Sequence, residues 1–365
     1  MAKDPVCAPG EKKVVVAMSG GVDSSVAAAI LKEEGYQVIG ITMQVWPPDK
    51  GAAFGGCCGV DAIEDAKKVA YNLGIPHYVL DFRDIFAEKV IADFCRQYSL
   101  GRTPNPCIRC NQYLKFDVLL KRAGGLGADF VASGHYARVE KDGSRYLLKK
   151  GVDRNKDQSY FLYTLTQPQL EHTLMPLGSL TKGEVRGIAS KLGLPVATKV
   201  ESQEICFIPD DNYADFVREC LPRSVKSGPV LNRRGEVLGE HRGIPFYTVG
   251  QRKGLGIAAR EPLYVTAIVP GRNAIVVGSK DEVYHKELIA GELNWISQGS
   301  LSEPIAARAK IRYRHQEAAA EIIPLEGGRV GARFKEPQMA ITPGQAVVFY
   351  LGDSVLGGGT IEKWA

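Results

Sequence analysis

A short stretch near the start of the chain, Ser-Gly-Gly-Val-Asp-Ser-Ser at residues 19–25, has the residue types of a phosphate-binding loop. It follows the β-branched run 14–16 and precedes a helix-forming run at 26–31, which predicts a strand, a glycine turn and a helix. Glycines let the backbone approach a ligand closely, and amides at a helix start point at bound anions. The Gly-Lys-Ser/Thr ending of a Walker A loop is missing. The alternative is an ordinary turn capped by Asp23 or Ser24.

The second stretch with chemical potential is Thr-Pro-Asn-Pro-Cys-Ile-Arg-Cys-Asn at residues 103–111, where two prolines stiffen the chain. We expect Cys110 to stand just before a helix. The field of the helix N-terminus, with Arg109 and Lys115 close in sequence, would then favour the nucleophilic thiolate. The alternatives for a lone Cys-x-x-Cys are a zinc half-site or a redox pair, and no second such pair completes a zinc site.

The sequence around each remaining cysteine indicates the role we expect for it. Cys206 lies in Ser-Gln-Glu-Ile-Cys-Phe-Ile at residues 202–208, and taken alone it would be a buried structural cysteine. We expect Cys95 and Cys220 to be core residues on helices. Cys7, Cys57 and Cys58 are expected to have no catalytic role.

Several stretches together resemble the bacterial tRNA-specific 2-thiouridylases, and the first loop alone resembles the pyrophosphate loop of enzymes that cleave ATP to AMP and pyrophosphate. The stretches that carry the resemblance are residues 17–25, 103–111, 156–162, 203–208, 247–256 and 342–345. They span nearly the whole chain.

The resemblance implies tRNA thiolation by a tRNA-uridine 2-sulfurtransferase. ATP, used with Mg²⁺, would adenylate the wobble uridine, and sulfur would then displace AMP at C2 to give 2-thiouridine, with pyrophosphate as the other product. Cys206 would carry a persulfide received from a sulfur-relay protein or a cysteine desulfurase. Cys110 would be the nucleophile, able to form a disulfide with Cys206.

The resemblance also assigns binding residues. Those that would contact ATP are Ala17, Met18, Ser19, Gly20, Gly21, Val22, Asp23, Ser24, Met43 and Gly134. Those that would contact tRNA are Asn105, Pro106, Cys107, His135, Lys156, Asp157, Gln158, Arg312, Tyr313 and Gln345. The residues alone leave plainer alternatives: core packing for Met43, a buried histidine for His135, a solvated loop for 156–158 and an exposed basic strand around Arg312.

Cys107 departs from the family pattern, because many members have an aspartate there. Cys107, Cys110 and Cys206 could therefore converge and hold a [4Fe-4S] cluster with one iron open to sulfide. The sequence leaves both routes open. We favour the persulfide route because two of the three thiols suffice for it.

The order of expected elements indicates an α/β fold. Strands are expected at 38–45, 77–81 and 129–133, and helices at 61–73, 85–98 and 115–123. This alternation predicts a parallel, Rossmann-like sheet with helices on both faces. The resemblance implies that the sheet is of the adenine nucleotide alpha hydrolase-like type. Ligands of such sheets lie at the carboxyl ends of the strands, where the glycine loop falls.

The pattern changes near residue 210. A helix is expected at 212–220, and then strands such as 274–277, 307–311 and 346–350 broken by turns at 232–235, 270–273 and 326–328, a pattern typical of an antiparallel barrel. We expect three domains. They are a pyrophosphate-loop catalytic domain at 1–210, a central linking domain at 211–280 and a tRNA-contacting C-terminal β-barrel at 281–365.

Composition narrows the functional class. The 365 residues are 45% hydrophobic with a net charge of +5, which allows large cores and an RNA partner. We find no membrane-length apolar run and no signal-peptide pattern, and eight clustered cysteines favour sulfur, redox or metal chemistry in the cytoplasm. Two competing functions are a small-molecule ATP-pyrophosphatase ligase, which has no need of Cys110 with Cys206, and a non-enzymatic metal- or RNA-binding module, which leaves the loop unexplained.

Overall fold

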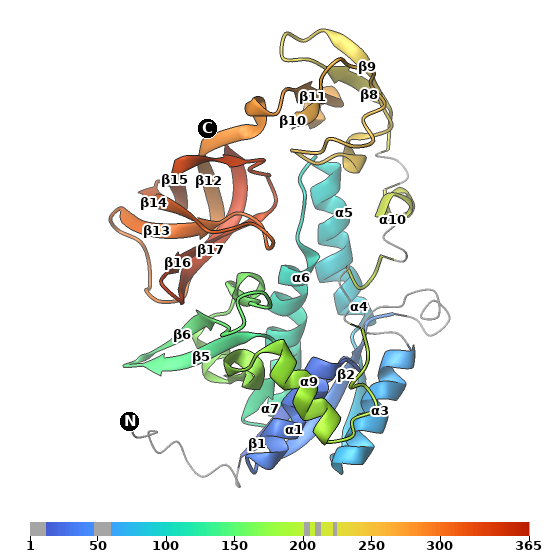
Figure 1. Ribbon diagram of the computed structural model, residues 1–365, viewed down its shortest axis with the longest axis vertical. Coiled ribbons are helices and arrows are strands. Elements are labelled where there is room, and N and C mark those ends of the chain that lie inside the picture. The colour runs from blue at the N-terminus through green and yellow to red at the C-terminus, as the bar shows by residue number, and fades with distance from the viewer. Residues whose placement is uncertain (1–11, 47–59, 201–204, 209–212, 222–224, 365) are drawn as a thin grey trace. The chain divides into compact units, whose positions relative to one another are not determined.

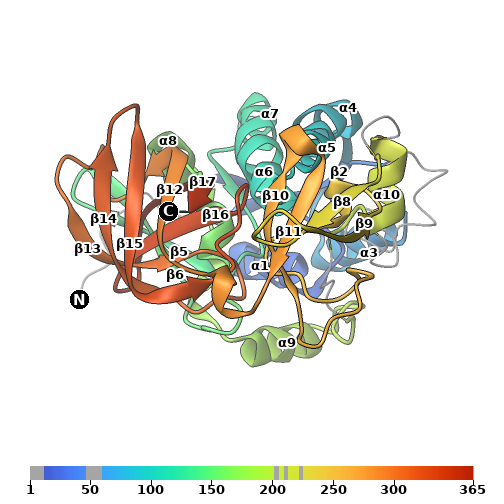
Figure 2. The ribbon, with the colours of Figure 1, turned by 90° about the horizontal axis from the view of Figure 1, so that it is seen from above.

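The computed structural model describes residues 12–46, 60–200, 205–208, 213–221 and 225–364. The chain divides into two compact units. The first contains residues 1–89, 107–211 and 353–355, and the second contains 90–106, 212–352 and 356–365. Figures 1 and 2 show their elements from two directions.

The first unit is built on a parallel sheet, as predicted. Its strands run in the order β3-β2-β1-β4-β7. Their bounds are β1 Lys13–Ala17, β2 Gln37–Gln44, β3 His77–Asp81, β4 Phe130–Ala132 and β7 Thr173–Leu174. In the central strand, Val15 pairs with Ile39 of β2 and Val131 of β4. Residues 14–16 are fully buried, as expected for β-branched residues in a sheet covered on both faces.

Helices α1 Val22–Glu33, α3 Val60–Leu73 and α9 Lys182–Lys191 share one hydrophobic core with the sheet. Val14 and Val16 belong to that core, whereas Val15 points to the other face because side chains alternate along a strand. The turn at residues 18–21 leads from the carboxyl end of β1 directly into α1 (Figure 1).

Two long helices contain π-helical segments. One runs from Arg83 to Ser99 as α4 Arg83–Phe86, η2 Ala87–Ile91 and α5 Ala92–Ser99, close to the helix predicted at 85–98. The other runs from Pro106 to Gly125 as α6 Pro106–Arg109, η3 Cys110–Val118 and α7 Leu119–Gly125. The expectation that Cys110 precedes its helix is therefore wrong. The helix begins at Pro106, a residue favoured in a first turn, and Cys110 lies one turn inside it.

The rest of the first unit is a hairpin with short helical turns. Strands β5 Ala137–Asp142 and β6 Arg145–Lys150 pair antiparallel. The short elements that follow are η4 Ser159–Leu162, α8 Gln167–Glu171 and η5 Pro176–Ser179.

The second unit contains a four-stranded sheet in the order β10-β11-β8-β9. The strands are β8 Gly228–Leu231, β9 Val237–His241, β10 Tyr264–Val269 and β11 Ala274–Gly278, with η7 Ile244–Phe246, η8 Pro270–Arg272 and η9 Asp281–Val283 between or after them. The predicted turns at 232–235 and 270–273 join successive strands. The predicted helix at 212–220 is α10 Tyr213–Cys220, with residue 212 outside the described part.

Helix α5 packs against α10 inside this second unit. The rings of Phe94 and Phe216 lie 5.9 Å apart, and those of Tyr98 and Tyr213 lie 5.6 Å apart. The thiols of Cys95, which is buried, and Cys220, which is half-buried, hydrogen-bond to each other. This contact, with burial second, raises the pKa of Cys95. Both cysteines thus stand on helices, and Cys95 lies in the core.

The C-terminal strands form a closed six-stranded antiparallel barrel, as predicted. Neighbouring strands follow the order β12-β15-β14-β13-β16-β17, and β12 pairs with β17 to close it. Their bounds are β12 Tyr284–Trp295, β13 Ile305–Lys310, β14 Ala318–Leu325, β15 Arg329–Met339, β16 Ala346–Leu351 and β17 Ser354–Trp364. Alternate residues fill the barrel, such as Val330, Ala332 and Phe334 on β15.

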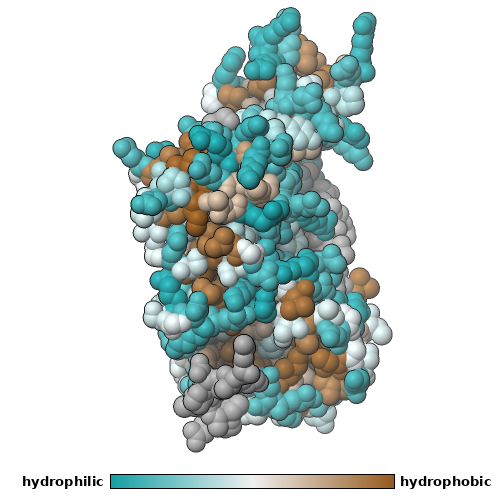
Figure 3. Space-filling view, turned by 60° about the vertical axis from the view of Figure 1, so that its left-hand side comes forward, coloured by the Kyte–Doolittle hydropathy of each residue, from teal (hydrophilic) through white to brown (hydrophobic). Residues whose placement is uncertain are grey.

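The molecular surface is mainly hydrophilic on the face drawn in Figure 3, where hydrophobic residues form small separate patches. Within the described residues no helix is long and apolar enough to cross a membrane.

Candidate active site

The glycine loop links the carboxyl end of β1 to α1 and is folded by its own serines. The amide of Ser19 donates to Ser24 Oγ at 3.1 Å. The hydroxyls of Ser24 and Ser25 donate to the Gly21 carbonyl at 3.2 and 2.8 Å. Gly21 is the N-cap residue, and no side chain caps α1. Ser24 therefore bonds within the turn, as one alternative predicted, while the start of α1 itself has no side-chain cap and presents its amides as an anion site does.

Two glycines allow this loop to be tightly held. Gly20 has φ +67°, and a Cβ placed on it would lie 2.1 Å from the carbonyl oxygen of Ala62 on α3. Gly134, which follows β4, lies against the first turn of α1, since a Cβ there would be 2.7 Å from both Asp23 C and Ser24 N. Only glycine fits either position without displacing backbone atoms.

Asp23 is paired with two residues that sequence reasoning missed. Its Oδ1 accepts from Lys182 Nζ at 2.7 Å and from the Tyr136 hydroxyl at 2.8 Å. Lys182 is the first residue of α9, where Thr181 and Glu184 form a capping box. The Thr-x-x-Glu pattern could have placed Lys182 at a helix start, but nothing in the sequence places that start beside Asp23.

A second lysine that the sequence did not indicate reaches the same loop. Lys199 Nζ donates to the Gly20 carbonyl at 3.0 Å and to Asp65 Oδ2 of α3 at 2.6 Å. The loop therefore has two ammonium groups beside it, although its own sequence contains no lysine.

The side chains of Met18 and Met43 are both buried. The Met18 carbonyl accepts from Thr42 Oγ1 at 2.8 Å, and that hydroxyl also lies 2.9 Å from His77 Nε2. Burial, and secondarily Lys67, lowers the pKa of His77. These hydrogen bonds fix the end of β2 next to Met43, one of the residues that the resemblance assigned to ATP.

The described cysteines of the predicted sulfur site are thiols in the first unit, Cys107 exposed and Cys110 and Cys206 half-buried. Cys206 stands in a tight turn closed by the Ile208 amide on the Ile205 carbonyl. Next to it Phe207 is fully buried, with its ring 5.7 Å from that of Phe86. This contact anchors Cys206 to the core of the first unit. Cys7, Cys57, Cys58 and residues 202–204 lie outside the described residues.

No group of three His, Cys, Asp or Glu residues in the described part of the chain could hold a metal ion. The alternative of an iron–sulfur cluster at Cys107, Cys110 and Cys206 stays a prediction. A lone carboxylate such as Asp23 does fit Mg²⁺, which proteins commonly hold with one or two carboxylates and the substrate's phosphates.

In the segment 156–158, assigned to tRNA by resemblance, the side chains of Asp157 and Gln158 make structural hydrogen bonds. Asp157 is buried, and its carboxylate accepts from the amides of Gly151 and Ser159, both at 3.1 Å. Gln158 Oε1 accepts from the Tyr136 amide at 3.0 Å. These bonds fix the chain that leads to Tyr136 and therefore to Asp23.

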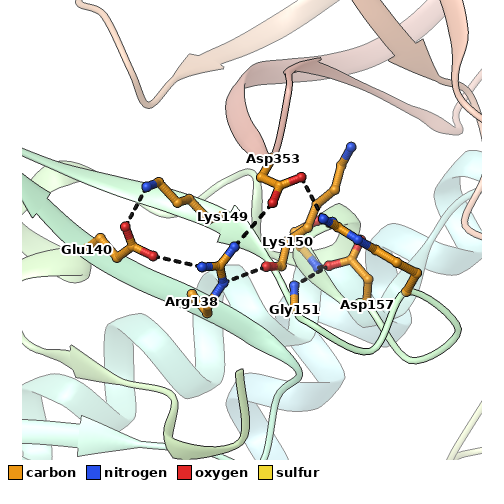
Figure 4. A network of polar contacts seen from close by, with 9 residues as sticks. Arg138, Glu140, Lys149, Lys150, Gly151, Asp157 and Asp353 are labelled. Carbon is orange, nitrogen blue, oxygen red and sulfur yellow. Dashed lines mark hydrogen bonds and ion pairs between the residues drawn. The ribbon is translucent and has the colours of Figure 1, made fainter. Parts of the chain in front are cut away.

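Beside this segment lies an ion-pair network (Figure 4). Asp353 accepts from Arg154 at 2.6 Å and from Arg138 at 3.4 Å, and Arg138 also donates to Glu140. The hydrogen bond from Arg154, more than the other charges, lowers the pKa of Asp353. These groups are partly exposed, so their main effect is to fix the geometry of the hairpin β5–β6.

His135 is buried with Nδ1 2.7 Å from Ser133 Oγ. Burial, with Lys115 second, holds its pKa well below the usual value. In this structure His135 is therefore a neutral interior residue, which matches the plainer of the two alternatives.

Gln345 and Arg312, both assigned to tRNA by resemblance, also have structural contacts in the second unit. Gln345 Nε2 donates to the carbonyls of Thr103 and Pro104 at 3.0 and 3.2 Å, which holds the segment that leads to Asn105 and Pro106. Arg312 donates to the Met339 carbonyl at 2.7 Å.

Close to Arg312 in the sequence, a lysine lies over an aromatic ring and an arginine is exposed. Lys310 Nζ lies 5.5 Å from the ring centre of Tyr313, and Arg314 is exposed.

Comparisons with known protein families show which kinds of domain the chain contains. Residues 12–210 match the model of the tRNA methyl transferase HUP domain, residues 214–279 that of the tRNA methyl transferase PRC-barrel domain and residues 285–361 that of the aminomethyltransferase β-barrel domain. The first unit, with its parallel sheet and glycine loop, is thus a HUP-type α/β domain.

Full-length relatives identify the family. A tRNA-specific 2-thiouridylase MnmA of Pelotomaculum thermopropionicum is 57% identical, covering 96% of this chain and 97% of its own. That of Moorella thermoacetica is 55% identical, covering 96% and 99%. The chain belongs to the tRNA-specific 2-thiouridylase family. Solved structures match weakly: an NMN synthetase of Francisella tularensis has a TM-score of 0.34 at 18% identity, covering 60% of this chain and 80% of that one, too weak to support an inference.

Proposed function

We propose that this chain is a tRNA-uridine 2-sulfurtransferase of the cytoplasm, which uses ATP to install sulfur at C2 of the wobble uridine of tRNA. The observation that carries the proposal is the match to 2-thiouridylases along almost the entire chain. The uncapped glycine loop at the carboxyl edge of the sheet supports ATP as cosubstrate, because such a loop suits the pyrophosphate of a nucleotide. Mg²⁺ bound with Asp23 would neutralise phosphate charge.

The proposed chemistry proceeds in two stages. The uridine O2 attacks the α-phosphate of ATP, pyrophosphate leaves and an O-adenylated uridine forms. The terminal sulfur of a persulfide on Cys206 then bonds to C2, and the C2–O bond breaks so that AMP leaves with the oxygen. Adenylation is needed because an amide-like oxygen is a poor leaving group.

Release of sulfur requires a second thiol. The thiolate of Cys110 attacks Sγ of Cys206 and the persulfide S–S bond breaks, which leaves 2-thiouridine and a Cys110–Cys206 disulfide. A thiol reductant resets the pair, and a sulfur-relay protein or cysteine desulfurase reloads Cys206. The half-buried state of both thiols and the anchored turn at Cys206 support these roles.

We extend the proposal to the binding residues and the domains. ATP binds residues 17–24, Met43 and Gly134, and tRNA binds through Asn105 to Cys107, Lys156 and the basic, aromatic segment of the barrel near Tyr313. Residues 1–210, 211–280 and 281–365 act as catalytic, linking and tRNA-contacting domains, and the close agreement of the three family models with these limits supports this division.

The test compares Cys206→Ser with wild type, using tRNA, ATP and a persulfide donor. Nucleoside mass analysis measures 2-thiouridine, and a coupled assay measures pyrophosphate separately. We expect the variant to release pyrophosphate without forming thiouridine, because the glycine loop handles phosphate and Cys206 handles sulfur. Cys220→Ser, which alters a half-buried thiol of the second unit, is the matched control and should retain thiolation. Substantial thiolation by Cys206→Ser would remove Cys206 from the mechanism.

A further inference from the structure

The glycine loop has no lysine of its own, whereas a Walker A loop carries one that contacts the phosphates. Lys182 bonds to Asp23, which lies 159 residues earlier in the chain, and Lys199 bonds to Gly20, which lies 179 residues earlier. We propose that Lys182 binds the pyrophosphate part of ATP at this loop and thus replaces the missing lysine. The identity of the ligand rests on the proposed function, whereas the binding site itself does not.

The position of the Lys182 ammonium supports this role. Its Nζ lies 2.7 Å from Oδ1 of Asp23, and Asp23 is the second residue of α1. An anion on the first-turn amides of α1 would therefore lie next to Nζ. An ammonium has three donors, so it can contact a phosphate oxygen while it keeps its bond to the carboxylate. The side chain is 11% exposed, and a charge contact there is stronger than at the open surface.

The backbone around Lys182 is fixed before any ligand binds. The Lys182 amide donates to Asp153 Oδ2 at 3.0 Å. The preceding residue, Thr181, donates its amide to Glu184 Oε2 at 2.7 Å, and its hydroxyl accepts from the Glu184 amide. The Tyr136 hydroxyl shares Asp23 Oδ1 with Lys182, so the carboxylate is oriented as well. A cation that is already held in place binds its ligand more tightly, because little conformational entropy is lost on binding.

Lys199 differs in what it contacts. Its ammonium donates to a backbone carbonyl, that of Gly20, and to Asp65 on α3, and it is 39% exposed. These bonds hold the shape of the loop on the α3 side, away from the first-turn residue Asp23. Lys199 is therefore the matched control, because its removal changes the charge equally and also removes a loop contact.

The competing explanation is that Lys182 only neutralises Asp23. The two explanations differ in a background that lacks the carboxylate. If Lys182 serves Asp23 alone, its loss has no effect on anion binding once Asp23 is Asn. If it binds phosphate, its loss weakens binding in both backgrounds.

The experiment is calorimetric titration of the full chain with inorganic pyrophosphate in Mg²⁺-free buffer, with adenosine as a second probe. The proteins are wild type, Lys182→Met, Asp23→Asn, the double variant and Lys199→Met. We expect Lys182→Met to bind pyrophosphate about 10- to 100-fold more weakly in both backgrounds, the range for a charge-assisted hydrogen bond. Asp23→Asn should tighten it by removing a like charge, and adenosine affinity should stay within about twofold of wild type.

Two results would overturn the proposal. One is equal pyrophosphate affinity of Asp23→Asn and the double variant. The other is an equal loss in Lys182→Met and Lys199→Met, which would indicate a general charge effect. If Lys182→Met does not fold, Lys182→Gln in the Asp23→Asn background, where no carboxylate is left without its lysine, gives the same comparison. The titration uses no tRNA or sulfur donor, so it tests pyrophosphate binding alone. If the chain binds pyrophosphate as expected but forms no thiouridine in the separate thiolation assay, only the proposed function is contradicted.

Discussion

Replacing Gly134 by alanine probes how closely the end of β4 supports the start of α1. The added Cβ would lie 2.7 Å from Asp23 C and Ser24 N and 2.9 Å from Asp23 Cβ. Carbon atoms in contact normally stay at least about 3.5 Å apart, so 3.5 − 2.7 leaves an overlap of roughly 0.8 Å. The obstructing atoms at the shortest distance are backbone, and therefore the first turn of α1 must move.

The size of the effect follows from that displacement. Overpacking of this kind costs about 1–3 kcal/mol of unfolding free energy. A misplacement of about 1 Å in a catalytic group can cost roughly 100-fold in rate. We therefore expect Gly134→Ala to fold with a lowered thermal midpoint and to lose about 100-fold in kcat/KM for ATP.

The assay measures pyrophosphate release at varied ATP concentration with saturating tRNA, together with calorimetric unfolding. Gly187→Ala is the control, because Gly187 lies inside α9 with no heavy atom within 4 Å of an added Cβ. This variant should retain activity, and its free energy of unfolding should rise by about 0.5–1 kcal/mol, the usual difference between alanine and glycine in a helix. Wild-type kcat/KM in Gly134→Ala would refute the inference that this contact positions the loop, even if stability falls.

Three further predictions concern other parts of the molecule. Arg314→Ala should weaken tRNA binding and reduce the magnitude of the log–log salt slope by up to about 0.9 without changing the thermal midpoint, because Arg314 is exposed; an unchanged slope in filter-binding titrations would argue against it. Since the pKa of His135 is lowered by burial, the folded state binds fewer protons than the unfolded state, and stability should fall as pH drops below the unfolded value of about 6.5. His135→Asn should therefore lose less stability between about pH 7.5 and about pH 5, and equal losses in urea midpoints would contradict this. Cys107→Ala and Cys107→Asp should retain persulfide-driven thiolation after anaerobic purification; activity lost from Cys107→Ala together with bound iron would reverse the choice between persulfide and cluster.

Local patterns in the sequence were enough for much of the fold. Continuous β-branched runs such as 14–16 predict strands that are buried on both faces, and their alternation with helices predicts a parallel sheet, which the structure has. The turns at 232–235, 270–273 and 326–328 are marked by glycine, asparagine and proline, whose backbone preferences are local. The glycine loop could also be found this way, because its glycines and serines are adjacent in the chain.

The helix that contains Cys110 shows where local reasoning stops. The sequence predicted its start near residue 115, but Pro106 begins it, and a π segment starts at Cys110. A π turn depends on packing around the helix, which the sequence does not display. For the same reason the sequence could not predict that α5 packs against α10, a contact that the aromatic pairs between these helices make.

The sequence by itself indicated the glycine loop as a candidate phosphate site, and its resemblance to the 2-thiouridylases made Cys110 and Cys206 the candidates for sulfur chemistry. The tertiary structure alone decided the surroundings of the loop. It brought Lys182, Lys199 and Tyr136 to the loop, and it buried His135 and Asp157, which the resemblance assigned to tRNA. Helix and strand patterns depend only on neighbours within a few residues. The bonds of Lys182, Lys199 and Tyr136 to the loop join positions more than 100 residues apart, and they form only when the chain folds around α1.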